Sequence, residues 1–241
     1  MVEPQVDFKR THDSLYLTKD RYDKPKEMFK FISSHAFKQK SINTNLEVLD
    51  FGCATGEFLF YLYETHPELS LSGIDILPEL IAKARILIPS ASLEVGSVLN
   101  NDSVDSDSFD LIFMIGVHSI FDEFETSFNN LIEWTRLGGR VFIYGMFNPY
   151  PIDVLVKYRL SNESGLYESG WNIHSQESIS NYLLNHPKVK NFEFHKFQIG
   201  IDLEQGQDLV RSWTIDDVNQ NRMITNGLSL LQPHYLLEIV L

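Results

Sequence analysis

One short stretch constrains the fold more than any other part of the chain. The strand-like stretch 46–51 begins with Leu46-Glu47 and ends in a mostly apolar run that contains Asp50, and the small-residue segment 52–56 follows it directly. A helical pattern of apolar residues then begins at Phe58. A strand that turns into a helix through glycines lets a ligand lie against bare backbone, at the positive N-terminus of the helix. The stretch therefore predicts a nucleotide-type binding site between a strand and a helix.

Strand-like and helix-like patterns alternate on both sides of this stretch. The expected strands are 46–51, 69–74, 92–95, 109–115 and 140–146, and the expected helices are 28–37, 57–65, 78–87 and 120–137. Such alternation with short connections predicts a parallel sheet with helices on both faces. Two later strands, 191–199 and 235–241, are expected to pair with each other at one edge. The predicted fold class is α/β, with a doubly wound, mostly parallel seven-stranded sheet and a closing antiparallel strand pair.

The remaining segments are interpreted as inserted lid segments. Residues 153–159 are expected to form a short helix, and Ser175 is expected to cap a helix that runs to Leu184. No linker composition marks a second domain. We therefore expect a single domain over 1–241, with a cofactor-binding core at 44–147 and lid or cap segments at 1–43, 148–190 and 201–233. The lid segments carry several aromatic and basic residues that suit a small-molecule pocket, namely Tyr150, Tyr158, Tyr167, Trp171, Arg159 and Arg211.

The overall charge argues against two classes of partner. The formal net charge is −13 and the pI is about 5.0, so the surface repels phosphate backbones and anionic lipid headgroups. Neither nucleic acid nor a membrane is therefore expected as a partner. Cys53 is the only cysteine, which excludes an intramolecular disulfide and a cysteine-based zinc site, and no metal site is predicted. The N-terminus does not resemble a signal peptide, so we expect a cytoplasmic protein.

The identity of the nucleotide depends on the residues around the glycines. A dinucleotide loop needs Gly-x-Gly-x-x-Gly, whereas this loop has Gly-x-Ala-x-Gly at Gly52, Ala54 and Gly56. No lysine follows the glycines, which excludes a P-loop. Asp50 and Glu57 flank the loop, and a carboxylate beside a pyrophosphate costs on the order of several kcal/mol. The loop therefore favours a positively charged ligand without phosphate, such as S-adenosylmethionine. An NAD-dependent oxidoreductase is the alternative, and it predicts that NAD displaces S-adenosylhomocysteine.

Five motifs then resemble one family, the class I S-adenosylmethionine-dependent methyltransferases. They have the family's order and spacing over residues 44–147, and they are Val48–Gly56, Gly73-Ile74-Asp75, Gly96-Ser97, Phe109–Ile112 and Leu137–Val141. The resemblance implies that S-adenosylmethionine is bound and that S-adenosylhomocysteine is the product. The two late strands match the closing antiparallel pair of that family.

The resemblance also implies a set of cofactor-binding residues. They follow the carboxyl ends of the predicted strands, and they are Asp50, Gly52, Ala54, Gly56, Asp75, Ile76, Ser97, Val98 and Ile115. The first four are expected to face the methionine part of the cofactor, Asp75 the two ribose hydroxyls, and Ile76 the adenine. Two positions depart from the family pattern. Ala54 replaces a second glycine, and Ser97 replaces an acid that often reads the adenine amino group, so that contact falls to the Ser97 hydroxyl or the Val98 backbone.

The sequence offers three candidates for a base that deprotonates the methyl acceptor. They are His118, His174 and Tyr150. For His118 the alternative is a polar residue that opens a helix beside the cofactor, and Asn148-Pro149-Tyr150 is interpreted as a turn. We expect methyl transfer to an O or N atom of a small molecule. The alternative function is a non-catalytic module that binds S-adenosylmethionine as a sensor or partner subunit.

Overall fold

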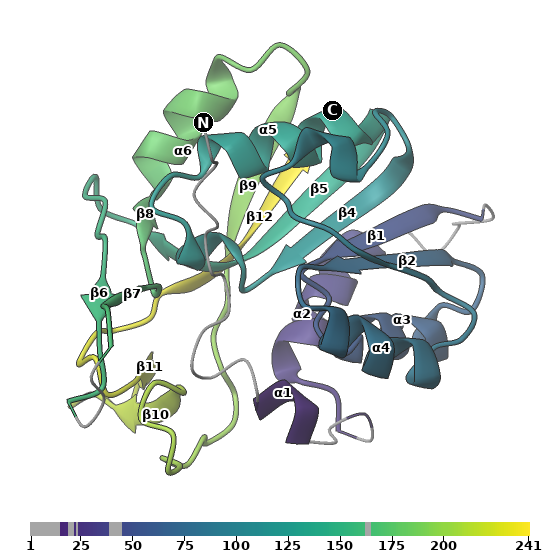
Figure 1. Cartoon of the computed structure of the whole chain (residues 1–241). Helices are drawn as coiled ribbons and strands as arrows, with labels where there is room; N and C mark the ends of the chain where they lie inside the picture. The colour runs from purple at the N-terminus through teal and green to yellow at the C-terminus, as the bar shows by residue number, and fades with distance from the viewer. Residues whose placement is uncertain (1–14, 19–21, 23, 39–44, 162–164) are drawn as a thin grey trace.

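A computed structural model of the chain describes residues 15–18, 22, 24–38, 45–161 and 165–241 (Figure 1). Its centre is a sheet with the strand order β3-β2-β1-β4-β5-β12-β9. These strands are β1 (Glu47–Phe51), β2 (Ser70–Asp75), β3 (Ser92–Val95), β4 (Phe109–Ile115), β5 (Thr135–Asn148), β9 (Asn191–Lys196) and β12 (His234–Val240). A two-residue strand, β8 (His174–Ser175), pairs with the end of β5 and adds an eighth member to the sheet.

One strand of the sheet runs against all its neighbours. Strands β1 to β5 pair in parallel, whereas β12 pairs antiparallel with β5 on one side and with β9 on the other. The mostly parallel sheet and its closing antiparallel pair are therefore confirmed. Because β1 and β4 are adjacent while their connections run to opposite edges, the carboxyl ends of these strands border a crevice. In parallel α/β sheets that crevice is where ligands bind.

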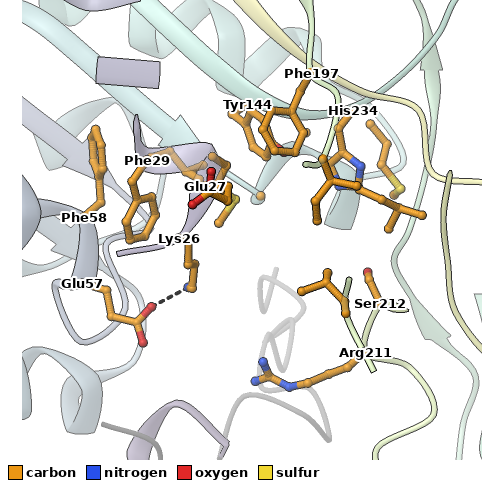
Figure 2. Close-up of a pocket in the computed structure, with 18 of the residues that line it drawn as sticks. Lys26, Glu27, Phe29, Glu57, Phe58, Tyr144, Phe197, Arg211, Ser212 and His234 are labelled. Atoms are coloured by element: carbon orange, nitrogen blue, oxygen red, sulfur yellow. Dashed lines mark ion pairs between the residues drawn. The ribbon is translucent and has the colours of Figure 1, made fainter. Parts of the chain in front are cut away.

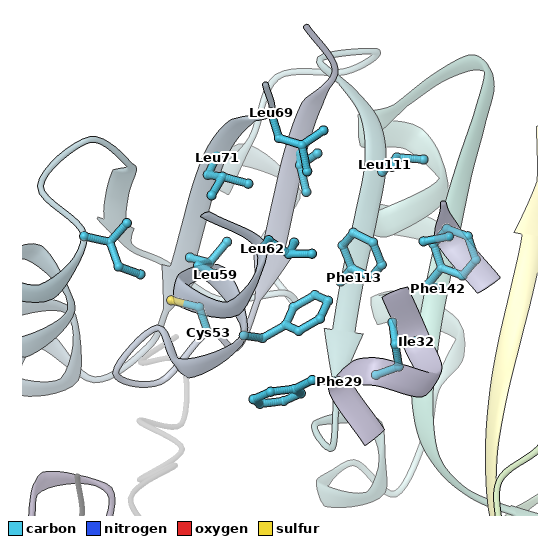
Figure 3. Close-up of a cluster of buried hydrophobic side chains, with 14 of the residues drawn as sticks. Phe29, Ile32, Cys53, Leu59, Leu62, Leu69, Leu71, Leu111, Phe113 and Phe142 are labelled. Atoms are coloured by element: carbon cyan, nitrogen blue, oxygen red, sulfur yellow. The ribbon is translucent and has the colours of Figure 1, made fainter. Parts of the chain in front are cut away.

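Helices cover both faces of the sheet. They are α1 (Leu15–Thr18), α2 (Glu27–Ala36), α3 (Glu57–Thr65), α4 (Pro78–Leu87), α5 (Glu125–Trp134) and α6 (Gln176–Leu184), with 3-10 turns η1 (Asn101–Ser103) and η2 (His118–Ile120). Helices α2, α3 and α4 pack on one face around Phe113 and Phe142 (Figure 3). Helices α5 and α6 pack on the other face around Ile112 and Ile143. Alternate residues of each strand therefore supply two separate cores, as the pleat requires.

Several element boundaries follow directly from local sequence signals. Helices α3 and α4 and strands β3 and β4 begin and end where the sequence pattern predicts. Pro78 lies in the first turn of α4, where its missing N–H has no intrahelical partner to lose. Ser175 caps α6, because its hydroxyl accepts a hydrogen bond from the Ser178 N–H at 3.0 Å.

The predicted helix 120–137 is wrong at both ends. The helix proper, α5, covers Glu125–Trp134, and the residues before it form η2 and an extended link. The carbonyl of Phe121 accepts hydrogen bonds from Asn172 and His174, so it is unavailable to a helix. At the other end, Thr135 pairs with Phe109 and begins β5.

The predicted short helix at 153–159 is also absent. Val154 forms a bridge with Ile173, and residues Lys157–Tyr158 form β6, which pairs with β7 (Glu168–Ser169). A second small hairpin, β10 (Trp213–Asp216) with β11 (Arg222–Thr225), lies below the sheet in Figure 1. Within the described residues, no helix is long and apolar enough to cross a membrane.

Trp134 packs between α5 and the sheet, and its replacement tests how much this packing contributes to the stability of the fold. The side chain is fully buried, stacks on Phe51 with ring centroids 5.3 Å apart, and donates a hydrogen bond to the Asn101 carbonyl at 3.1 Å. We expect Trp134→Ala to lower the free energy of unfolding by about 3–5 kcal/mol because it leaves a cavity. Leu137→Ala, at an exposed position of β5, is the control and should change it by less than about 0.5 kcal/mol. Urea unfolding measures both, and an equal effect of the two substitutions would contradict this account.

Candidate active site

The loop after β1 is tied to the neighbouring strand through its backbone. The N–H groups of Gly52 and Cys53 both donate to the Ile74 carbonyl, at 2.7 and 3.0 Å. Gly52 has φ +77°, and a Cβ built on it would lie 2.3 Å from a methyl carbon of Val117. Only glycine fits this position, because the chain both turns left-handed and passes close to the start of the β4–α5 link.

Asp75 fixes the tip of the same loop. Its carboxylate accepts a hydrogen bond from the Ala54 N–H at 2.9 Å and one from the Leu77 N–H at 3.0 Å. Ala54 has φ +49°, an uncommon conformation for a residue with a side chain. The Asp75 carboxylate therefore holds the loop after β1 and the start of the β2–α4 link together.

Two cavities meet at this loop, and their linings share Gly52, Ala54, Ile115 and Gly116. The smaller cavity, of about 110 Å³, is lined by Asp75, Ile76, Ser97 and Val98, among others. The larger, of about 1020 Å³, includes Asp50 in its lining. Eight of the nine predicted cofactor residues therefore line one or both cavities: Asp50, Gly52, Ala54, Asp75, Ile76, Ser97, Val98 and Ile115.

Gly56 is the predicted cofactor residue that lines neither cavity. It precedes α3 with φ +81°, and its N–H donates to the Cys53 carbonyl at 2.8 Å. A Cβ there would lie 2.9 Å from a methyl carbon of Ile88, which belongs to the packing behind the loop. Gly56 therefore shapes the turn into α3 and does not face a ligand in this structure.

Asp50 is a buried carboxyl group at the end of β1 that faces the larger cavity. Only 3% of the residue is exposed, and its Oδ1 atom has no hydrogen-bond partner among the described residues. Burial, together with the nearby charge of Asp75, raises the pKa of Asp50 to about 8. An orphaned buried oxygen of this kind fits a ligand that brings a cationic N–H donor, as the ammonium group of S-adenosylmethionine does.

Lys26 is a site residue that the sequence analysis missed. It lies just before α2, and its ammonium group forms an ion pair with Glu57 at 2.5 Å (Figure 2). The same charge acts on Asp50 and lowers its pKa, against the larger effect of burial. The two acids that flank the loop are therefore not two free negative charges. No local sequence signal connects Lys26 to the loop, because Lys26 lies 24 positions before Asp50 and 31 positions before Glu57.

His118 lies on the far side of β5 from the larger cavity. Its ring stacks on Phe147 at 4.5 Å and is completely buried, and Nε2 donates a hydrogen bond to the Met146 carbonyl at 3.0 Å. The ring occupies the space beside Gly145 that a side chain there would fill. Burial lowers the pKa of His118 to about 3, so the ring is neutral. These contacts give it a packing role and no path to a ligand in the cavity.

The two other predicted bases also lie outside both cavities. His174 is buried on β8, where Nε2 donates to the Phe121 carbonyl at 3.1 Å and the ring packs edge-on against Phe124. Tyr150 is 69% exposed in the turn after β5. Of the aromatic and basic lid residues noted in the sequence, Trp171 and Arg211 line the larger cavity, whereas Tyr158, Tyr167 and Arg159 do not.

The walls of the larger cavity come from segments distant in sequence. One wall is the N-terminal part of the chain, with Tyr16 and the start of α2; the opposite wall is the segment 199–212. Tyr16 and Arg211 connect the two walls, with the guanidinium 5.6 Å from the ring centre. The floor consists of Tyr144, Phe197 and His234, which lie next to one another in Figure 2.

The central part of the chain matches a known family. Residues 49–141 match the family model described as a methyltransferase domain, which covers β1 to the middle of β5 and contains the Gly52 loop and Asp75. The match agrees with the strand order, with the closing antiparallel pair and with the loop after β1, where the buried carboxyl group of Asp50 fits a cationic ligand. Residues 49–141 are therefore a methyltransferase domain, and the chain shares the fold of solved methyltransferase structures. The methyltransferase is therefore an enzyme that uses S-adenosylmethionine.

Solved structures share the fold of this methyltransferase at low sequence identity. The YcgJ protein from Bacillus subtilis is 11% identical with a TM-score of 0.58, over 88% of this chain and 97% of its own. A chain from a complex that contains the Haloferax volcanii Trm112 methyltransferase activator is 16% identical with a TM-score of 0.60, over 96% and 98%. A Haemonchus contortus phosphoethanolamine N-methyltransferase, solved with S-adenosylhomocysteine, is 14% identical with a TM-score of 0.55, over 77% and 42%.

Asp75 allows a direct test of the cofactor site. Asp75→Ala removes the proposed ribose acceptor and also releases the Ala54 N–H that holds the loop. Because hydrogen bonds to a charged group are each worth about 1.5–3 kcal/mol, we expect S-adenosylhomocysteine to bind at least about 100-fold more weakly. Calorimetric titration measures the affinity, and His118→Ala is the matched control that should retain measurable binding. Normal affinity in Asp75→Ala would contradict the assignment.

The raised pKa of Asp50 predicts that cofactor binding releases protons. At pH 7 a carboxyl with a pKa of about 8 is mostly protonated, and a nearby cation favours the ionised form and lowers that pKa. We therefore expect the release of about one proton for each S-adenosylhomocysteine molecule bound at pH 7. The affinity for S-adenosylhomocysteine should rise with pH up to about 8. Calorimetry in two buffers of different ionisation enthalpy measures the release. Asp50→Asn should abolish it; equal release by both proteins would show that another group titrates.

Proposed function

We propose that the methyltransferase transfers a methyl group to an O or N atom of a small-molecule acceptor. The observation that carries this proposal is the larger cavity, which continues from the cofactor loop past β4 and β5 to β12. Its volume of about 1020 Å³ lies at the upper end of the range of about 300–1,000 Å³ that is usual for small-molecule sites. A cavity of this size supports a cofactor and a compact acceptor side by side.

The residues of the chain divide between these two ligands. We assign Asp50 to the ammonium group of the cofactor and Lys26, already near Asp50, to its carboxylate. Asp75 is assigned to the ribose hydroxyls, and Ile76, Ser97 and Val98 to the adenine, because these four line the small cavity together. A buried hydrogen bond from Asn130 to the Val98 carbonyl, at 2.8 Å, holds the Val98 backbone in place at this cavity.

Bound S-adenosylmethionine supplies a methyl group on a positively charged sulfur, which a nucleophile displaces in line. The chain then has to align the acceptor and exclude water. Tyr16 lines both cavities, and the Lys83 ammonium group donates hydrogen bonds to the carbonyls of Tyr16 and Leu17 at 3.3 and 3.1 Å. Tyr22 donates a hydrogen bond to the Thr55 carbonyl at 2.8 Å, next to the loop. These contacts support a role for the N-terminal segment as a cover over the cofactor.

We also propose that residues 1–241 act as one domain in which the lid segments serve the acceptor. The support is that 199–212 and the described part of 1–43 both line the larger cavity with the core. Of the expected lid segments, residues 1–14, 19–21, 23, 39–43 and 162–164 lie outside the described residues. Of the segment 148–190, Trp171 alone lines that cavity among the described residues, so this segment has the smaller part in the proposal.

Transfer of labelled methyl groups tests the proposed acceptor class. The full-length protein is incubated with methyl-labelled S-adenosylmethionine and, separately, with the small-molecule, protein and nucleic-acid fractions of a cell extract. We expect label in a metabolite of the small-molecule fraction, because the acceptor site is a bounded cavity and the net charge of −13 repels nucleic acid. Mass spectrometry identifies the product.

One control variant and two contrary outcomes make the result decisive. Asp75→Ala should lose the transfer together with the cofactor affinity, which shows that label moves through this site. Label in the protein or nucleic-acid fraction alone would overturn the small-molecule proposal. Tight binding of S-adenosylmethionine with no transfer to any fraction would instead favour the alternative function, a module that binds the cofactor without turnover.

A further inference from the structure

His234 is a chemistry-bearing residue in the larger cavity that no sequence motif marks. It opens β12 opposite Met146 on β5, while Tyr144 lies two residues before Met146 on the same face of the sheet. The His234 ring stacks on Tyr144 with centroids 5.5 Å apart, and Phe197 packs edge-on against Tyr144 at 5.5 Å. Figure 2 shows these three rings together at one end of the cavity.

The strand order separates this end of the cavity from the cofactor loop. Asp50 ends β1, and β4 and β5 lie between β1 and β12. Neighbouring strands are about 4.8 Å apart, so the His234 end is roughly 14 Å across the sheet from Asp50. The residues assigned to the cofactor lie on the side of the cavity that is next to β1, β2, β3 and β4. His234 therefore faces the part of the cavity that remains for the acceptor.

A backbone carbonyl determines which nitrogen of His234 carries the proton. Nδ1 lies 2.9 Å from the Gln232 carbonyl oxygen, and because a carbonyl can only accept, Nδ1 donates. In a neutral ring the other nitrogen, Nε2, then has a lone pair and no hydrogen. Nε2 has no hydrogen-bond partner among the described residues. Burial lowers the pKa of His234 to about 4, against the hydrogen bond to Gln232, so the ring is neutral at physiological pH.

We propose that Nε2 of His234 accepts a hydrogen bond from the atom that is methylated, so that the acceptor group is an amine or a hydroxyl. This inference rests on the proposed function. Holding the N–H or O–H hydrogen of a neutral amine or hydroxyl at Nε2 turns the lone pair of the same atom toward the cofactor side of the cavity. As that atom bonds to the methyl carbon, the carbon–sulfur bond breaks and its electrons stay on sulfur, so that neutral S-adenosylhomocysteine leaves. The N–H or O–H proton passes to Nε2 and from there to solvent. A carboxylate has no hydrogen to donate, and its lone pairs repel that of Nε2.

The histidine itself can be observed without knowledge of the acceptor. In ¹⁵N-histidine-labelled protein saturated with S-adenosylhomocysteine, long-range proton–nitrogen spectra report the tautomer of each ring. We expect His234 as the neutral Nδ1–H form from pH 6 to 8. Three matched probes are then titrated: 2-phenylethylamine, 2-phenylethanol and 3-phenylpropanoate. The amine or the alcohol should shift the Nε2 resonance and the carboxylate should not. A proton on Nε2, or an equal response to all three probes, would overturn the proposal.

Variants test the same contact during turnover on the small-molecule fraction. His234→Leu keeps the volume and removes the acceptor atom, so we expect about 10-fold slower transfer with unchanged affinity for S-adenosylhomocysteine. His234→Gln offers an amide oxygen and should stay within about 3-fold of the wild type. His186→Gln, at the end of α6 and outside both cavities, is the control.

The outcomes separate this inference from the proposed function. Wild-type protein that transfers label to no small molecule contradicts the proposed function, and the spectra of His234 still decide the tautomer. If the wild type transfers label and His234→Leu transfers it equally fast, the proposed role of His234 is overturned and the proposed function stands. A large loss of S-adenosylhomocysteine affinity in His234→Leu would show that the residue supports the cofactor site and would equally overturn this inference.

Discussion

The bond between the Asp75 carboxylate and the Ala54 N–H supports the rest of the site. It joins the loop after β1 to the end of β2 at the one point where the loop carries a side chain in a left-handed conformation. That conformation costs a residue with a Cβ roughly 1–2 kcal/mol, and a hydrogen bond to a charged group returns a similar amount, about 1.5–3 kcal/mol. The departure from the family pattern at Ala54 is thus tolerated because Asp75 holds it. The same carboxylate borders the small cavity, so the loop geometry and the proposed ribose contact depend on one group.

Electrostatics at the loop works differently from what the sequence alone suggests. The sequence places two acids, Asp50 and Glu57, beside the glycines and favours a cationic ligand on that ground. In the structure Lys26 pairs with Glu57, and Asp50 is held close to neutrality by burial. The preference for a cation then comes from an unsatisfied carboxyl group that ionises when a positive group arrives, because ionisation without a partner is costly in a buried site. The conclusion is the same, but its cause is desolvation and not two exposed charges.

The parts of the fold that the sequence predicts are those determined locally. The helices 57–65 and 78–87 and the strands 92–95 and 109–115 match, since each has its own periodicity and its own stop signal. The helix 120–137 does not match, because its ends are determined by bonds from Asn172 and His174 and by the pairing of Thr135, all of which come from other segments. The residues expected at the cofactor site follow the ends of locally predicted strands, and eight of the nine line a cavity. Gly56 does not, because it serves the packing behind the turn.

The acceptor side could not be predicted in the same way, and the histidines show why. His118 follows Gly116, whose φ of +73° interrupts the alternation of faces along β4, so the sequence does not determine on which face of the sheet its ring lies. Its ring lies on the α5 side, away from the cavity. His234 is placed by the antiparallel pairing of β12 with β5, a contact across almost ninety residues, and by a carbonyl two residues earlier. Strand order and pairing register thus decide which histidine can meet an acceptor. In our proposal, the methyltransferase core holds the cofactor at the loop after β1, while β12 and the segment 199–212 contact the acceptor.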